Sequence, residues 1–150
     1  MIYRKATFKD VEAIHKLVND YADKGLMLPR SRNAIYETLR DVVLAEDNGE
    51  IVGAGGLHLI WDELAEIRAL AVVPDRTRGG VGRKIVDMLT EEAKEIGVKT
   101  LFTLTYQTGF FASLGFTEVP KEKLPHKVWK ECINCSKFPN CDEVAMVKEL

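Results

Sequence analysis

The 150-residue chain has little excess charge of either sign, no long apolar run and few cysteines. Its 21 basic and 23 acidic residues give a formal net charge of −2, which argues against nucleic-acid binding because that needs a basic face. No uncharged apolar run approaches the roughly 18 residues of a membrane span. Three cysteines, an odd number, fit a reducing compartment, and residues 1–10 contain no apolar signal core. We therefore expect a cytoplasmic protein.

No internal repeat, low-complexity tract or interdomain linker is present, so we expect one domain over residues 1–150. Alternating and β-branched runs predict strands at 2–6, 42–47, 51–60, 65–73, 98–106, 116–119 and 143–150. Apolar residues at helical spacing predict helices at 7–22, 31–39, 85–96 and 108–115. This order is typical of an α/β fold with helices on both faces of one sheet.

Three local signals fix the ends of these elements. Thr7 with Asp10 forms a variant of the capping box, and Ser31 is a good residue to cap the second helix. Asn48-Gly49 is typical of a two-residue hairpin turn.

A basic, glycine-rich stretch lies between a predicted strand and a predicted helix. Residues 75–85, DRTRGGVGRKI, hold three glycines within four positions and four basic side chains. Amides at a helix start carry partial positive charge, and glycine lets them approach a phosphate closely. We therefore expect a pyrophosphate site at residues 78–83, named here the glycine turn. Ile85 occupies the last position of a G-x-G-x-x-G pattern and so excludes a dinucleotide fingerprint. The alternative is a plain tight turn on a basic surface.

Residues 70–97 resemble the acetyl-CoA-binding segment of the GNAT family of N-acetyltransferases, with the pattern Q/R-x-x-G-x-G/A. Gly80 and Gly82 match its glycines, but Thr77 stands at its first position, between Arg76 and Arg78. Residues 110–116, FFASLGF, resemble the family's F-Y-x-x-x-G-F element.

The resemblance implies acetyl-CoA as cosubstrate and a mixed central sheet that is splayed at the acetyl-CoA site, with helices on both faces. The Leu70 amide would polarise the thioester carbonyl, and the glycine turn would bind the pyrophosphate. The residues implied in acetyl-CoA binding are Leu70, Ala71, Val72, Arg78, Gly79, Gly80, Val81, Gly82, Arg83 and Phe110.

Amine acetylation needs a group that accepts the proton of the amine. Strand alternation predicts that Glu66, Arg68 and Leu70 share one face, so Glu66 is the candidate proton acceptor. An ion pair between Glu66 and Arg68 is the alternative. Phe111 stands where the family often has a tyrosine acid, so Tyr106 is the candidate acid. The alternatives are a half-buried aromatic at Tyr106 and a thiolate that leaves without a protein acid.

Residues 21–58 and 65–72 resemble the acetyltransferase domain of N-acetylglutamate synthases, above all in the G-L-x-L-P-R element that ends at Arg30. The resemblance implies that Arg30 binds one substrate carboxylate and that Arg32 or Arg68 binds the other. Taken alone, Arg30 is better interpreted as a residue that caps or solvates a loop, but beside Glu66 and the glycine turn the carboxylate contact is favoured. The resemblance further implies acetylation of the α-amine of L-glutamate in arginine biosynthesis, by a stand-alone form without the arginine-sensing domain. Members of the family often form homodimers.

The stretch 125–142 shows no clear periodicity and contains Cys132, Cys135 and Cys141. C-x₂-C is metal-ligand spacing, but no standard second pair follows, so the cysteines are a weak zinc candidate and no metal is expected. Free thiols or a Cys135–Cys141 disulfide are the alternatives. We expect His15 and His58 to be structural.

Two other functions stay open beside glutamate acetylation. One is acetylation of another small amine or of a protein N-terminus. A polyamine pocket should be lined with acids, and Arg30 argues against it. The other is an acetyl-CoA-binding sensor without turnover, suggested by Phe111 and Thr77.

Overall fold

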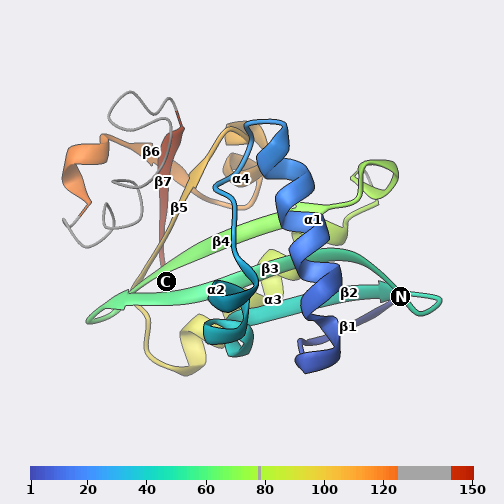
Figure 1. The fold of residues 1–150 in the computed structure, drawn as a ribbon. Coiled ribbons are helices and arrows are strands. Elements are labelled where there is room, and N and C mark those ends of the chain that lie inside the picture. Colours follow the sequence, from blue (N-terminus) through green and yellow to red (C-terminus); the bar gives the residue numbers. More distant parts are fainter. Residues whose placement is uncertain (78, 125–142) are drawn as a thin grey trace. The chain divides into compact units, whose positions relative to one another are not determined.

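The computed structural model describes residues 1–77, 79–124 and 143–150 (Figure 1). The strands are β1 (Ile2–Lys5), β2 (Val42–Asp47), β3 (Glu50–Trp61), β4 (Leu64–Val72), β5 (Thr100–Thr105), β6 (Thr117–Val119) and β7 (Val144–Glu149). The helices are α1 (Val11–Asp23), α2 (Arg32–Glu37), α3 (Val81–Glu95) and α4 (Thr108–Ser113). Short 3₁₀ turns are η1 (Phe8–Asp10), η2 (Leu39–Asp41), η3 (Pro74–Arg76) and η4 (Lys121–Lys123).

The strands form one mixed sheet in the order β1-β2-β3-β4-β5-β7-β6. β4 and β5 are parallel, whereas β1 with β2, β2 with β3, β5 with β7 and β6 with β7 are antiparallel. The predicted α/β fold with a mixed sheet is confirmed. The chain forms two compact units, the first made of Met1–His58 and Ile67–Glu92 and the second of Leu59–Glu66 and Ala93–Leu150.

The predicted capping residues and hairpin turn form in the structure. The carboxylate of Asp10 accepts hydrogen bonds from the Thr7 amide and hydroxyl, at 2.8 and 3.1 Å. Ser31 Oγ accepts from the Ala34 amide and caps α2. Asn48 and Gly49 both have positive φ, 51° and 83°, and join β2 to β3 as the turn that their residue types favour.

In the first unit, helices pack on both faces of the strands, with α1 and α2 in front of them and α3 behind in Figure 1. The front core comprises Val11, Ile14, Leu17, Val18, Ile35, Leu39, Leu44, Ala54 and Ala71. On the other face α3 lies against the backbone of β3. A Cβ at Gly53 would come within 2.9 Å of Val81, and one at Gly55 within 2.8 Å of Ile85. The missing side chains in β3 therefore let α3 sit close to the sheet.

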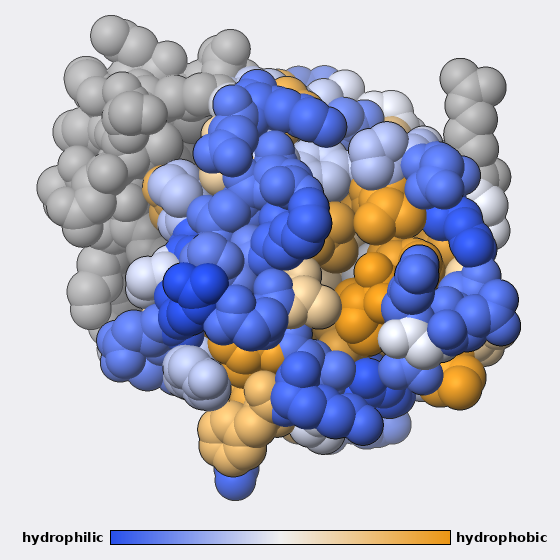
Figure 2. All heavy atoms as spheres, turned by 45° about the vertical axis from the view of Figure 1, so that its right-hand side comes forward, coloured by the Kyte–Doolittle hydropathy of each residue, from blue (hydrophilic) through white to orange (hydrophobic). Residues whose placement is uncertain are grey.

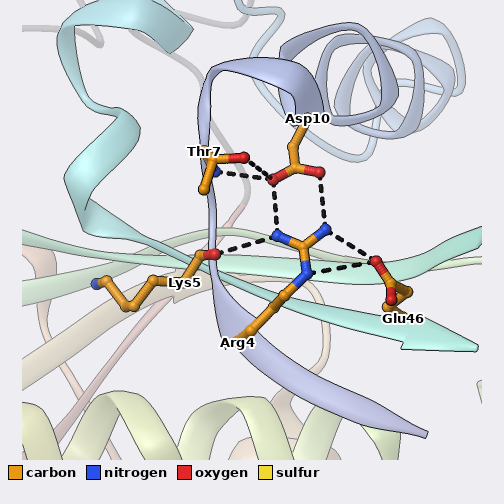
Figure 3. Close-up of polar contacts among 5 residues, drawn as sticks. All are labelled: Arg4, Lys5, Thr7, Asp10 and Glu46. Carbon is orange, nitrogen blue, oxygen red and sulfur yellow. Dashed lines mark hydrogen bonds and ion pairs between the residues drawn. The ribbon is translucent and has the colours of Figure 1, made fainter. Parts of the chain in front are cut away.

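Arg4 links β1, η1 and β2 through a buried carboxylate (Figure 3). Its guanidinium donates to both oxygens of Asp10, at 2.8 and 2.9 Å, and to Glu46 at 2.9 Å. Asp10 is only 5% exposed, and the hydrogen bond from Arg4, aided by those from Thr7, holds the pKa of its carboxyl well below the usual range. The network fixes where α1 begins relative to β1.

In the second unit, β5 pairs with β7 over its whole length and with the first three residues of β4. The ring of Phe111 is buried and makes edge contacts with Phe110 and Phe116, with ring centres 5.1 and 5.2 Å apart. Gly115, at φ 94°, ends this turn, and Lys148 Nζ donates to the Leu114 carbonyl at 2.8 Å. Phe111 is thus a core residue of this unit.

Candidate active site

One pocket of the first unit lies on its α1 and α2 side. Its walls are largely apolar, and four of the lining residues carry charged or titratable side chains, namely Arg30, Asp41, His58 and Arg68. The full lining is Ile14, Val18, Arg30, Ile35, Thr38, Asp41, Val42, Gly55, Gly56, His58, Arg68 and Ala69. Figure 2 shows hydrophobic residues gathered in a recess that hydrophilic side chains surround. An apolar pocket with a few converging polar groups is the usual form of a small-molecule site.

Asn19 on α1 places Arg30. Its side-chain amide donates to the Arg30 carbonyl at 2.9 Å and accepts from the Arg30 amide at 3.2 Å. The same amide donates to the His15 carbonyl one turn earlier in the helix. Gly25, at φ 73°, lies just after α1 and begins the loop that leads back to this contact. The predicted G-L-x-L-P-R element is therefore attached to α1 at its arginine.

Asp41 and His58 form a pair within the pocket. Nδ1 of His58 lies 2.8 Å from Oδ2 of Asp41, and both side chains are about one-third exposed, at 33% and 28%. Asp41 ends η2, and His58 lies on the neighbouring strand β3. His58 lies in a strand as expected, and its ring also lines the pocket beside Arg30 and Arg68.

The backbone of β4 is irregular at Ala69, a position named here the bulge, and this changes which side chains reach the pocket. Ala69 has a φ of 52°, a left-handed conformation that is rare for a residue with a Cβ. Arg68 and Ala69 both line the pocket, whereas Leu70 Cδ1 lies beside Gly55 on the α3 side. The predicted shared face of Arg68 and Leu70 is therefore wrong, because the bulge interrupts the strand alternation between them.

Beyond the bulge, the Val72 carbonyl accepts a 2.6 Å hydrogen bond from the Tyr21 hydroxyl. The next amide, that of Val73, donates to Val52 on β3. Because successive peptide groups of a strand point to opposite edges, the Val72 amide faces away from β3. This edge of β4 thus presents an amide at Val72 next to a carbonyl that Tyr21 already binds.

Arg32 lies outside this pocket. It forms a two-pronged ion pair with Glu12, with distances of 2.7 and 2.9 Å, and its side chain is 57% exposed. The hydrogen bond to Glu12 raises the pKa of Arg32. Of the three arginines predicted to bind carboxylates, the structure brings Arg30 and Arg68 together and leaves Arg32 on the surface.

The glycine turn leads into α3 as expected. Gly80 has a φ of 80°, and an added Cβ there would meet open space. The first helical hydrogen bond runs from the Lys84 amide to the Gly80 carbonyl, so the amides of residues 81–83 precede it at the positive end of a 15-residue helix. Such a turn fits an anionic pyrophosphate. Arg78 lies outside the described residues.

The two residues that precede Arg78 make local contacts. Arg76 forms an ion pair with Asp47 on β2, and this contact raises the pKa of Arg76. The hydroxyl of Thr77 donates to the Pro74 carbonyl.

A family model described as the acetyltransferase (GNAT) family matches residues 11–116, which include the pocket, the bulge and the glycine turn. The chain belongs to this family.

Two curated proteins support this membership over most of the chain. An uncharacterized N-acetyltransferase of Chlorobaculum tepidum is 40% identical over 147 residues, 98% of this chain and 95% of that protein. An amino-acid acetyltransferase of Mycobacterium tuberculosis is 38% identical over 133 residues, 87% of this chain and 76% of that protein. The protein is thus an N-acetyltransferase.

Similar solved structures support the same family membership. A protein of Mycobacterium tuberculosis in complex with CoA and NLQ has a TM-score of 0.87 at 33% identity, covering 100% of this chain and 99% of that one. N-acetylglutamate synthase from Neisseria gonorrhoeae, complexed with coenzyme A and N-acetyl-glutamate, has a TM-score of 0.89 at 26% identity. The match covers 99% of this chain and 35% of that one. Acetyl-CoA is accordingly the donor substrate of this GNAT acetyltransferase.

The remaining predicted site residues of the acetyltransferase lie in its second unit. Glu66 is 8% exposed in the part of β4 that pairs with β5, opposite Phe102. Tyr106 directly follows β5 and is half-buried, and Phe110 lies on α4.

Cys132, Cys135 and Cys141 lie outside the described part of the chain. Among residues 1–77, 79–124 and 143–150, no group of three His, Cys, Asp or Glu side chains is placed to hold a metal ion. Over the same residues, no helix is long and apolar enough to cross a membrane.

Asn19, Asp41 and His58 are the site residues that sequence reasoning missed. Asp41 and His58 are 17 positions apart, and their pairing depends on the register of β2 with β3, which sets Val42 opposite Gly56. Asn19 resembles any polar residue on the solvent side of an amphipathic helix. A motif with fixed spacing would have revealed them, but the sequence offers none.

Proposed function

We propose that this acetyltransferase transfers the acetyl group of acetyl-CoA to the α-amine of L-glutamate. The observation that carries the proposal is the presence of Arg30 and Arg68 in one pocket. A guanidinium binds a carboxylate through two parallel hydrogen bonds, so two arginines suit a substrate with two carboxylates. The names of the Mycobacterium and Neisseria relatives support an amino-acid acceptor.

The proposed donor site follows the edge of β4 that faces away from β3 at Val72 and the start of α3. The Leu70 amide would hydrogen-bond the thioester oxygen as negative charge develops on it. Leu70 directly follows the bulge at Ala69, so its backbone direction differs from that of a regular strand. The proposed contacts to the rest of acetyl-CoA are Ala71, Val72, Arg78, Gly79, Gly80, Val81, Gly82, Arg83 and Phe110.

Glu66 and Tyr106 keep their proposed chemical roles. Glu66 would take the proton that the nitrogen releases once the carbon–nitrogen bond has formed. Tyr106 would return a proton to the thiolate of CoA. Their support is their position in the sequence, since Glu66 precedes Leu70 by four residues on β4 and Tyr106 directly follows β5.

The wider assignment follows from the proposed reaction. An L-glutamate acetyltransferase would act in the cytoplasm, in arginine biosynthesis, on a small-molecule substrate rather than on nucleic acid or membranes. We also propose a homodimer, as is common in the family.

The test measures CoA thiol release from acetyl-CoA by the purified full chain, with a panel of L-amino acids, polyamines and peptide N-termini. Preferential turnover with L-glutamate is the expected result. Turnover with a monoamine lacking a second carboxylate would overturn the dicarboxylate pocket. Acetyl-CoA binding without turnover for any acceptor would overturn the catalytic proposal in favour of a sensor.

A further inference from the structure

Arg30 and Arg68 match only two of the three charged groups of a free dicarboxylic amino acid. Arg30 and Arg68 suit two carboxylates, whereas the third charged group of a free dicarboxylic amino acid is its ammonium. The lining offers one carboxylate, that of Asp41, and it is hydrogen-bonded to His58. The ammonium is also the group that must lose a proton before it can react, because a protonated amine has no lone pair for attack on a thioester.

The Asp41 contact determines the hydrogen position on the His58 ring. A carboxylate only accepts hydrogen bonds, so the 2.8 Å contact requires a hydrogen on Nδ1. In the neutral ring Nε2 then carries the lone pair. Among the described residues, Asp41 is the hydrogen-bonding partner of this ring. Asp41 therefore holds the tautomer whose Nε2 can accept a proton.

From this geometry we propose that His58 is the base that converts the bound acceptor from ammonium to amine, and that Asp41 is its positioning residue. The inference rests on the proposed function. Nε2 of His58 takes one proton from the ammonium, and the negative charge of Asp41 offsets the positive charge that the ring gains. The nitrogen lone pair then attacks the thioester carbon, the carbon–nitrogen bond forms, and the carbon–sulfur bond breaks with its electron pair on sulfur.

The protons balance over the whole reaction. The ammonium loses two protons, one to His58 before attack and one from the nitrogen after attack, the step assigned to Glu66. One proton returns to the thiolate to give CoA, and the other leaves to solvent when His58 is deprotonated again. The roles of His58 and Glu66 therefore differ in timing, and they differ in the dependence on pH that each predicts.

The pocket around His58 holds few other charged groups. The charged and titratable groups that line the pocket are Arg30 from the loop, Asp41 from η2, His58 from β3 and Arg68 from β4. α1 and α2 contribute the apolar side chains Ile14, Val18 and Ile35. The described wall thus contains one imidazole, and a pH dependence that disappears on its replacement can be assigned to it.

The experiment measures kcat/KM for L-glutamate against pH in the full chain, for wild type, His58→Gln and Asp41→Asn. At neutral pH, the kcat/KM of His58→Gln should be about 100-fold lower than that of wild type, which is the lower end of the range for removal of a general base. The loss should shrink tenfold per pH unit toward the pKa of the acceptor amine, because the free amine then needs no base. Asp41→Asn should lower kcat about tenfold, and Asp41→Glu should restore part of it.

Controls separate this role from a structural one. His15→Gln replaces a histidine on α1 that does not line the pocket, and it should keep the wild-type profile. Glu66→Gln should lower the rate at every pH. Acetyl-CoA affinity and the thermal midpoint should stay at wild-type values in both His58→Gln and Asp41→Asn. Nitrogen-15 NMR of the wild-type protein should show the Nδ1–H form of the neutral His58 ring.

The outcomes distinguish the two proposals. Wild-type turnover of L-glutamate with a constant deficit in His58→Gln at all pH values would overturn the role of His58 and leave the proposed function intact. The Nε2–H form in the NMR spectrum would overturn it equally. No wild-type turnover with L-glutamate would overturn the proposed function itself, and with it the role of His58.

Discussion

The side-chain amide of Asn19 binds both backbone polar groups of Arg30, accepting from its amide and donating to its carbonyl. A helix residue thus fixes a loop residue 11 positions later in the chain. The loop would otherwise have to order Arg30 when the substrate binds, at a cost in conformational entropy.

Replacing Asn19 with Ala should therefore raise the KM for L-glutamate by up to about 30-fold, because two hydrogen bonds of roughly 1 kcal/mol each hold the loop. Acetyl-CoA affinity should not change. Steady-state kinetics with each substrate varied would show this. Asn33→Ala is the matched control, since Asn33 bonds the exposed Glu37 on α2 and does not line the pocket. Equal losses in both variants would refute the positioning role.

The three arginines should differ in their effects on substrate binding. Arg30→Ala and Arg68→Ala should each raise the KM for L-glutamate by 100-fold or more, since each removes a charge-assisted contact worth roughly 3 kcal/mol. Arg32→Ala should change the KM for L-glutamate by less than twofold, because Arg32 pairs with Glu12 on the surface. Steady-state kinetics of the three variants, with acetyl-CoA affinity measured by calorimetry, would show which arginines bind the substrate. A dominant effect of Arg32 would contradict the pocket assignment.

Gly80→Val should weaken acetyl-CoA binding. Gly80 has a φ of 80°, and a β-branched residue there must leave the left-handed region and change the direction of the amides that start α3. Gly49→Val is the matched control, because Gly49 has nearly the same φ, 83°, in the turn between β2 and β3. Both variants should lose stability, but only Gly80→Val should lose acetyl-CoA affinity by calorimetry. Equal affinity in the two variants would argue against the glycine turn as the phosphate site.

Asp10 should give the protein a stability that acid removes. Its pKa is lowered in the folded state by Arg4 and Thr7, so the carboxylate stabilises the fold above the unfolded pKa near 3.9 and this contribution declines as the pH falls below that value. Asp10→Asn should cost about 2 kcal/mol at pH 7, between the values typical of surface and buried pairs. Urea unfolding at pH 7 and at several values below 4 should show the difference shrinking. Asp20→Asn, which removes an exposed pair with Lys16, should show little effect at any pH.

Local sequence signals predicted much of the fold. Ser31 caps α2, Asn48-Gly49 forms the hairpin turn, and β2 spans the predicted residues 42–47. Each of these depends on interactions within a few residues, so the chain carries them wherever it folds. The glycine turn before α3 is of the same kind.

The site residues that a motif marks stay predictions, and the contacts that depend on the register between strands were not predicted. The alanine residue type gives no hint of a left-handed conformation at Ala69. With this conformation, Arg68 lines the pocket and Leu70 lies on the α3 side of the sheet. Arg32 looked equivalent to Arg30 in sequence, but Glu12, 20 residues earlier, binds it on the surface.

The sequence by itself determined the helices, the strands, the turn at the start of α3 and the identity of Arg30 as a candidate ligand, because propensity and short motifs act over a few residues. The tertiary structure alone decided which charged groups share the pocket. Asp41 meets His58 because β2 and β3 pair in one register, and Arg68 lines the pocket with Arg30 because β4 bulges at Ala69. Such meetings follow from long-range packing, whose free energy no local stretch of the chain contains.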